Sequence, residues 1–426
     1  MKLLYLILVV TICLLAWRIN NPGDLRLNRR YLARYLKDAQ GNGPVKVSTR
    51  KLVVDRPSGA PEERSFYNIE AEFVDTSRRS IMAQVVYPLE ELHREREKKN
   101  LPGAQETDMM QGLTNMQGSS DVGARLKEDP FKDLAVEEKV TAAKVAMVKA
   151  EVDQLRLLST RCELFPRLIA HDEQRLITIT DSVGKQRLDD VWQELDAVAK
   201  QSLLEQLVQD LAVFHSRSED LIALVPSGPG YSEKSVREAL RASLDTGLEL
   251  EPIRTEDVLA AAGPLYATAQ LEQGLRLVNG SPRGFYVNGK RAKRLDWAGL
   301  RRDLPAFDVI ELVCDPALGL SAEQEEHYFR VYLDKLQQLT EPDTTIPTVH
   351  DLRCLAIYYQ IVLVGHLAHF KRIAKAASSK SPLDVKHWPT NSLQQVADKL
   401  LVHLQADGEL KELSDQLVPV LQPLLK

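Results

Sequence analysis

Residues 277–308 constrain the fold of this chain more than any other stretch. An Asn-Gly-Ser-Pro turn leads into a short apolar strand at 285–287, and Asn288-Gly289 is typical of a two-residue hairpin turn. A second strand then runs to Leu295-Asp-Trp297. The pattern predicts a β-hairpin with an acidic residue at its end, inside a half of the chain that otherwise has helical periodicity.

The first half of the chain has a different pattern. Residues 67–74 and 80–87 alternate with period two around a turn at 75–79, which predicts an antiparallel hairpin, and residues 45–54 contain one further possible strand. A helix at 136–159 follows, and then two strands within 163–180. No glycine-rich loop joins these strands, so backbone N–H groups are not expected to hold a phosphate here.

The remainder is helical by its 3.6-residue periodicity, outside the hairpin. The predicted helices are 188–195, 200–214, 233–246, 255–262, 265–274, 303–313, 322–339, 352–377, 392–405 and 408–425. Between 89 and 135 the chain is polar and irregular, which indicates a mobile insertion; Met109, Met110 and Met116 in it are either part of a featureless loop or an adaptable partner surface.

The N-terminus predicts attachment to a membrane. Residues 3–17 are apolar and uncharged but short for a span, so they suit an uncleaved anchor, a signal peptide or a buried helix. No small-residue cleavage site follows, and the next segment is rich in arginine, which places the body in the cytoplasm under the positive-inside rule. Residues 24–38, with Leu25, Leu32, Tyr35 and Leu36 on one side, suit either an anionic membrane surface or a solvated basic linker.

Composition sets the limits for the rest. With 426 residues, 44% hydrophobic and 27% charged, the chain is globular, and a net charge of −5 gives no support for nucleic-acid binding. The four cysteines have no metal-ligand spacing and are expected to be buried, reduced thiols: Cys13, Cys162, Cys314 and Cys354. We predict five regions: a transmembrane anchor at 1–20, a basic juxtamembrane helix and linker at 21–63, a β-rich N-lobe at 64–181, a helical C-lobe at 182–380 and C-terminal helices at 381–426.

Five short motifs, in this order, resemble those of the aminoglycoside phosphotransferase and choline kinase superfamily, a branch of the protein-kinase-like fold. They are Glu151-Val-Asp-Gln-Leu-Arg-Leu-Leu158, Leu176-Ile-Thr-Ile-Thr-Asp181, Leu211-Ala-Val-Phe-His215, Leu295-Asp-Trp297 and Asp303-Leu-Pro-Ala-Phe-Asp308. The resemblance covers roughly residues 67–377. It implies an α+β fold with two lobes, a small β-rich N-lobe and a large helical C-lobe, behind the N-terminal transmembrane helix.

The resemblance also implies roles for single residues. Asp296 matches the Mg²⁺-binding carboxylate, and Asp308 matches the aspartate that braces the catalytic loop by accepting backbone hydrogen bonds. Asp303 matches an N-terminal cap of the following helix, and Glu151 matches the helix glutamate that pairs with a strand lysine near the nucleotide phosphates.

Three departures from the family pattern concern the chemistry itself. Where the family has H-G-D-x-x-x-x-N, this chain has the shorter loop 279–284, so Asn279 replaces the histidine, Ser281 replaces the catalytic aspartate, and the metal-binding asparagine falls on Gly284 or in the gap. A serine hydroxyl cannot accept the substrate proton as a carboxylate can. Gln84 takes the place of the strand lysine, which leaves Lys144 and Lys149 on the following helix as other sources of a cation.

Three functions fit these observations. The favoured one is a membrane-anchored cytoplasmic pseudokinase that scaffolds or regulates a protein partner without being an enzyme. The second is an ATP- and Mg²⁺-dependent phosphotransferase for a small or lipid-linked molecule, with Asp296, Asp303 or Glu151 recruited to the reaction. The third is an interaction protein of another fold, with a helical bundle as its C-terminal half. If the strands at 67–87 and 163–180 do not share one sheet, the resemblance is wrong.

Two further groups of residues are candidates for binding. The histidines His350, His366 and His369 have no third ligand at a metal-binding spacing, and we expect them to be structural. The basic residues after the hairpin turn suit a solvated edge or a site for an anionic partner: Lys290, Arg291, Lys293, Arg294, Arg301 and Arg302.

Overall fold

The computed structural model describes residues 27, 29–38, 40–52, 64–86, 130–217, 219–222, 225, 231–277, 279–297, 300–342, 344–376 and 391–425. The predicted anchor at 3–17, Cys13, the loop at 226–230 and the insertion as far as residue 129 lie outside these ranges. Within them, none of the helices has the length and apolar character needed to cross a membrane. The anchor therefore stays a prediction.

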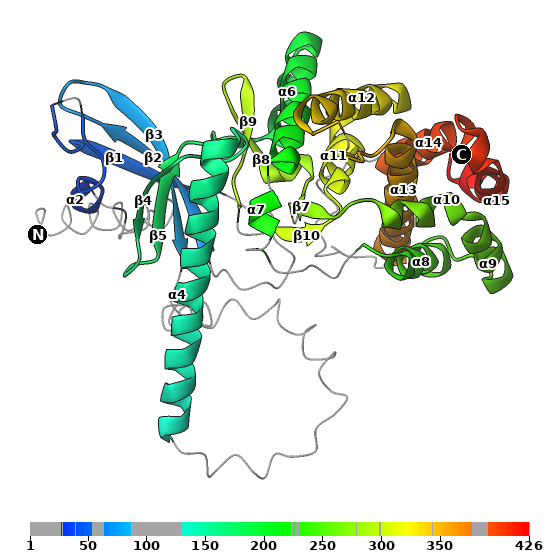
Figure 1. The fold of residues 1–426 in the computed structure, drawn as a ribbon, viewed down its shortest axis with the longest axis horizontal. Helices are drawn as coiled ribbons and strands as arrows, with labels where there is room; N and C mark the ends of the chain where they lie inside the picture. Colours follow the sequence, from blue (N-terminus) through cyan, green and yellow to red (C-terminus); the bar gives the residue numbers. More distant parts are fainter. Residues whose placement is uncertain are drawn as a thin grey trace, which may run out of the picture. The chain divides into compact units, whose positions relative to one another are not determined.

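The chain folds into two compact units, and the first is built on a β-sheet. Unit 1 comprises Met1–Asp153 and Arg167–Ser182. Its five strands are antiparallel in the order β1-β2-β3-β5-β4 (Figure 1). Their bounds are β1 Lys46–Leu52, β2 Arg64–Glu72, β3 Arg78–Val86, β4 Leu168–Asp172 and β5 Ile177–Asp181.

The pairing within this sheet answers whether the strands at 67–87 and 163–180 share one sheet. β3 pairs with β5 from Ile81 opposite Asp181 to Val85 opposite Ile177, so the predicted hairpin and the two later strands share one sheet. The resemblance therefore passes this test. β1 also belongs to the sheet, so the predicted boundary at residue 63 divides one structural unit.

The segment predicted to lie on a membrane or to be a solvated linker packs on the sheet instead. Its short helix α2, Arg29–Leu32, is flanked by turns, and Leu27, Tyr31, Leu32 and Leu36 are at most 3% exposed within one apolar cluster with the sheet residues. The expectation of an apolar face offered to a lipid surface is wrong for these residues, because the sheet already covers that face.

Helix α4, Pro130–Arg161, starts six residues before the predicted helix start at residue 136. Its residues up to Asp153 belong to unit 1 and the rest to unit 2. Val148 and Val152 pack on Val86 and Leu176, on the face of the sheet that also carries the side chain of Gln84.

Unit 2, Gln154–Pro166 and Val183–Lys426, is mainly helical. Its helices are α5 Leu188–Val191, α6 Ala197–Ser216, α7 Glu219–Ile222, α8 Glu233–Ala242, α9 Pro252–Ala261, α10 Gly263–Ala267, α11 Ala306–Val313, α12 Ala322–Leu339, α13 Val349–Ala376, α14 Ser392–Gln405 and α15 Lys411–Leu421. A π-turn at Ser243–Gly247 extends α8. A large apolar core joins α8, α9, α10, α13, α14 and α15.

Two small sheets lie within unit 2. The predicted hairpin is present as β8 Phe285–Asn288 and β9 Arg291–Arg294, with Gly289 at φ +64° in the turn, and β6 Gln186–Arg187 pairs with β8. β7 Gly274–Arg276 pairs with β10 Arg301–Asp303. This second ribbon was not predicted, because its strands have only three residues each and leave no periodicity to detect.

Candidate functional site

The loop that the resemblance matches to a catalytic loop, residues 279–284 between β7 and β8, is closed by its own hydrogen bonds. The side-chain oxygen of Asn279 accepts from the N–H of Ser281 at 3.1 Å, and the N–H of Gly284 donates to the carbonyl of Ser281 at 2.9 Å. Residues Pro282–Gly284 form one 3₁₀ turn. Asn279 is therefore engaged in shaping the loop.

Asp308, in the first turn of α11, braces the chain just before this loop. It is fully buried, and its carboxylate oxygens accept from the N–H of Leu277 at 2.9 and 3.2 Å. One of these oxygens also lies 3.1 Å from Nε2 of His215, whose Nδ1 is 2.9 Å from the hydroxyl of Tyr332. These contacts hold the end of α6, the start of α11 and the end of β7 together.

Arg276 is a buried cation of this region that was not among the predicted site residues. Its guanidinium contacts Asp303 at 2.9 Å and Glu311 at 2.5 Å, lies 3.8 Å from Asp308, and is only 8% exposed. It also lies over the ring of Phe307, 4.6 Å from the centroid. A signal for a buried cation is present in the sequence: three carboxylates, at 303, 308 and 311, lie just before and within one apolar helix.

Glu311 carries this network to the loop. Its second oxygen accepts from the N–H of Gly280 at 2.7 Å. Burial raises the pKa of Glu311, and the neighbouring Arg276 opposes that rise. A Cβ at Gly280 would lie 2.9 Å from the backbone of Asp308, so the loop can approach α11 this closely only with glycine at 280.

The predicted helix-capping role of Asp303 is wrong. Asp303 ends β10, and α11 begins at Ala306 after Pro305, with no side-chain cap. The carboxylate instead accepts from the N–H groups of Tyr231 and Leu304 and pairs with Arg276. The intervening Leu304-Pro305 moves the helix start beyond the reach of Asp303.

Arg294 fills the space beside the loop. Although it was predicted to lie on a solvated edge or on a surface for an anionic partner, it is 4% exposed; its Nη1 donates to the carbonyl of Asn279 and its Nε to the carbonyl of Asp296 at 3.0 Å. A Cβ at Gly284 would overlap this guanidinium. Burial lowers the pKa of Arg294, while the nearby carboxylate of Asp296 acts to raise it.

Asp296 follows the hairpin and lies near a fixed cation, because its carboxylate acts on the pKa of the buried Arg294 guanidinium. Proteins usually hold Mg²⁺ with one or two carboxylates together with waters and substrate phosphates. Among the residues that the structure describes, no group of three histidine, cysteine or acidic side chains could hold a metal. The metal role of Asp296 stays a prediction.

A second cluster fixes the other side of the loop. Arg283 lies 3.7 Å from Asp189 on α5, and Arg187 contacts Asp189 and Asp190 at 3.2 and 3.1 Å. Burial raises the pKa of Asp189, and Arg187 opposes this. The loop thus presents an arginine, Arg283, that is engaged with its own unit.

In unit 1, Glu151 of α4 has a cation that the sequence did not predict. Arg64 at the start of β2 contacts both oxygens of Glu151, at 3.0 and 3.1 Å, with 16% and 10% of the two side chains exposed. Gln84, at the expected lysine position on β3, is 3% exposed. Lys149 is exposed on α4, and the side chain of Lys144 lies outside the described residues.

The remaining expectations concern histidines and cysteines. His350 lies 2.7 Å from Asp407 and 3.4 Å from Glu409, and burial lowers the pKa of His366 on α13, with His369 adding to the effect. Cys162, Cys314 and Cys354 are buried free thiols, as predicted.

Comparison with known proteins returns structures alone: neither a family model nor a curated protein sequence matches the chain. A choline/ethanolamine kinase family protein from Mesorhizobium loti is 10% identical, with 91% of this chain and 97% of that chain covered and a TM-score of 0.42. A choline kinase from Cryptosporidium parvum Iowa II is 12% identical, with 98% and 99% covered and a TM-score of 0.40. The ADP-bound aminoglycoside phosphotransferase APH(2'')-Ib is 11% identical, with 84% and 93% covered and a TM-score of 0.36.

At these identities and TM-scores the likeness carries no argument about what this chain binds or does. The matched proteins are of the kind that the sequence motifs indicate. The strand order of unit 1, with α4 between β3 and β4, and the helical unit 2 have the order of elements expected from those motifs. The solved structures to which the chain is similar thus include choline kinases and an aminoglycoside phosphotransferase.

Proposed function

We propose that this chain is a kinase-fold protein that does not transfer phosphate and that acts as a scaffold or regulator through a protein partner. The observation that carries the proposal is the buried guanidinium of Arg294, bonded to the carbonyls of Asn279 and Asp296. This fixed cation lies beside Asp296, the carboxylate that the resemblance matches to a metal ligand.

The loop chemistry supports the same conclusion. Phosphoryl transfer needs a group that orients or deprotonates the attacking hydroxyl and metal ions that neutralise the phosphates. Ser281 supplies no carboxylate for the first task, and the amide oxygen of Asn279 is used within the loop. An asparagine ligand at 284 would have to displace Arg294.

One observation favours the alternative, an atypical phosphotransferase for a small or lipid-linked molecule. The resemblance implies that a helix glutamate paired with a strand cation serves nucleotide binding, and Glu151 has such a cation in Arg64. The pair stands on β2 instead of β3, so the cation absent at Gln84 is supplied by the neighbouring strand.

The two proposals differ in what ATP does. We expect the full chain with Mg²⁺ to hydrolyse no ATP above the level of Asp296→Asn, and Arg64→Met to leave that level unchanged. Turnover that is lost in Asp296→Asn and in Arg64→Met, and kept in the matched variant Arg50→Met on the exposed part of β1, would establish the alternative.

Nucleotide binding is measured separately by thermal shift, because a ligand that binds only the folded state raises the unfolding temperature by mass action. A metal-independent shift that disappears in Arg64→Met is compatible with a regulator that keeps a nucleotide. The predicted anchor at residues 3–17 and a cytoplasmic body are part of the proposal. Protease protection of tagged termini in intact cells tests that topology.

A further inference from the structure

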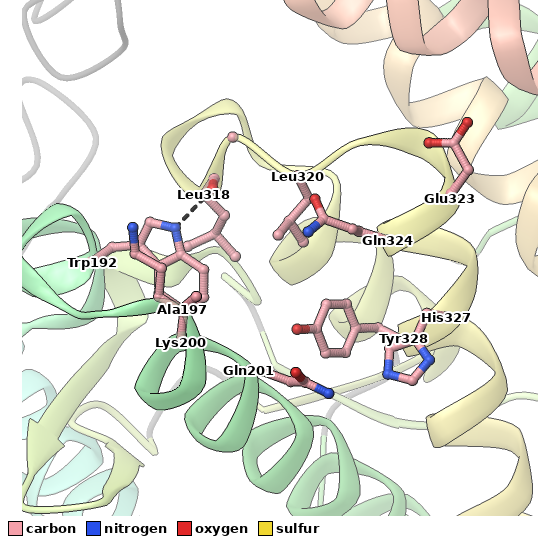
Figure 2. Close-up of a pocket in the computed structure, with 11 residues that line it drawn as sticks. Trp192, Ala197, Lys200, Gln201, Leu318, Leu320, Glu323, Gln324, His327 and Tyr328 are labelled. Carbon is pink, nitrogen blue, oxygen red and sulfur yellow. Dashed lines mark hydrogen bonds between the residues drawn. The ribbon is translucent and has the colours of Figure 1, made fainter.

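A pocket of about 590 Å³ opens in unit 2, away from the residues discussed so far (Figure 2). It lies between the first turns of α6, the first two turns of α12 and the loop that leads from the 3₁₀ turn Pro316–Leu318 into α12. This volume is in the range of sites for small organic ligands.

The floor of the pocket is apolar and held in place. Trp192, Leu320 and Tyr328 are 2%, 8% and 5% exposed, and the indole N–H of Trp192 donates to the carbonyl of Leu318 at 2.7 Å. Gly319, at φ +62°, lets the chain reverse between Leu318 and Leu320. A ligand would therefore meet preformed walls.

Two glutamine side chains on the rim are oriented by their own partners. The Nε2 of Gln201 donates to the carboxylate of Glu205 at 2.9 Å, and the Oε1 of Gln324 accepts from the N–H of Ser321 at 2.9 Å. A carboxylate only accepts and a backbone N–H only donates, so these partners fix which end of each glutamine amide is the nitrogen and which is the oxygen. Among the described residues the opposite ends have no partner, so Gln201 offers an acceptor and Gln324 a donor.

Two more polar groups complete the pocket. Figure 2 shows the hydroxyl of Tyr328 pointing into it from a buried ring, and no hydrogen bond to that hydroxyl is found in the described part of the chain. The ammonium of Lys200 lies 5.7 Å from the centre of the Trp192 ring and, within the described ranges, has no carboxylate at ion-pair distance. Glu323 is directed away from the pocket, and Glu205 is shared by Gln201 and His327.

We propose that this pocket binds a small organic acid with a planar apolar body. Its carboxylate pairs with Lys200, its body lies against Leu320 and the ring of Tyr328, and a donor group on it meets the oxygen of Gln201. The amide of Gln324 and the hydroxyl of Tyr328 serve a further acceptor. Three groups that can donate, one of them the positively charged Lys200, favour an anion over a cation, although the Tyr328 hydroxyl can also accept. This inference does not depend on whether unit 2 supports phosphoryl transfer.

Indole-3-acetate is a suitable probe, because it combines a carboxylate, a planar apolar body and one N–H donor, and indole-3-acetamide is its uncharged match. Saturation-transfer NMR on the full chain should give a dissociation constant on the order of 1 mM for the acid, as expected for a ligand of this size. We expect the amide to bind about fivefold more weakly, since it loses one exposed ion pair worth up to about 1 kcal/mol.

Three variants assign the binding to the pocket. Lys200→Met should weaken the acid about fivefold and leave the amide unchanged. Leu320→Trp, which fills the pocket, should abolish binding of both. Lys234→Met, which removes an 85% exposed lysine on α8, is the matched control and should change neither. Three results would each overturn the proposal. They are equal binding of acid and amide, binding that survives Leu320→Trp, and no saturation by the acid up to 10 mM, which is about ten times the expected dissociation constant.

Discussion

Replacing Arg276 with methionine tests the buried ion network most directly. Methionine keeps the unbranched apolar part of the side chain and removes the charge. Asp303 would still contact Arg301 at 3.1 Å and two N–H groups, and Asp308 would keep the N–H of Leu277 and His215. Glu311 would keep only the N–H of Gly280, so it is the carboxylate left without compensation.

The size of the effect follows from this count. Removing one partner of a buried ion pair costs about 3–5 kcal/mol, because the remaining charge is buried and unpaired. Burial already raises the pKa of Glu311, and losing Arg276 must raise it further. In the variant the native state then holds a proton that the unfolded chain releases above a pKa of about 4.3. The loss should be largest near pH 7.5 and shrink as the pH falls through the raised pKa of Glu311.

Urea unfolding followed by tryptophan emission measures this loss. Trp192 and Trp297 are buried in unit 2, and Trp17→Phe with Trp388→Phe removes the other two tryptophans of the chain. Arg237→Met is the matched control, because that arginine is 46% exposed and its pair with Glu256 spans 3.7 Å, so the cost should stay below about 1 kcal/mol.

Adding Glu311→Leu to Arg276→Met should restore most of the loss, since the unpaired charge is removed as well. The reasoning fails if Arg276→Met costs less than about 1 kcal/mol at pH 7.5, if the cost is the same at pH 5, or if the second substitution deepens it.

Two further substitutions test single features of unit 2. Asp315 is 3% exposed and accepts from the N–H of Ala317, and burial is the main cause that raises its pKa to about 6. Asp315→Asn can still accept that bond, so it should stabilise the chain by up to about 3 kcal/mol at pH 7.5 and by nothing near pH 4. A gain in stability that does not depend on pH would contradict the ionisation argument. Gly280→Ala should lower the free energy of unfolding by about 1–3 kcal/mol, because the added Cβ meets the backbone of Asp308. Gly408→Ala is the control: a Cβ there meets nothing within 4 Å, so stability should change by less than about 1 kcal/mol. Equal costs of the two substitutions in urea unfolding would show that the close approach at Gly280 is not tight.

Much of the local structure could be read from the sequence. The hairpin turn at Asn288-Gly289, the strands around 67–87 and the helices at 322–339 and 392–405 follow from turn chemistry and from periods of two and 3.6 residues, which depend on neighbours in the sequence. The resemblance likewise implies from sequence alone that Ser281 stands where the family has a carboxylate.

The tertiary structure decided where the cations go. Arg64, Arg276 and Arg294 were absent from the predicted roles or placed on a solvated edge, yet each ends on a particular carboxylate or carbonyl: Glu151, Glu311 and Asn279. An arginine reaches across several residues of backbone and bonds in any of several directions, so its partner depends on which strands and helices pack together. A period in the sequence fixes which face of an element is buried, but only the fold shows which charges are buried along with it.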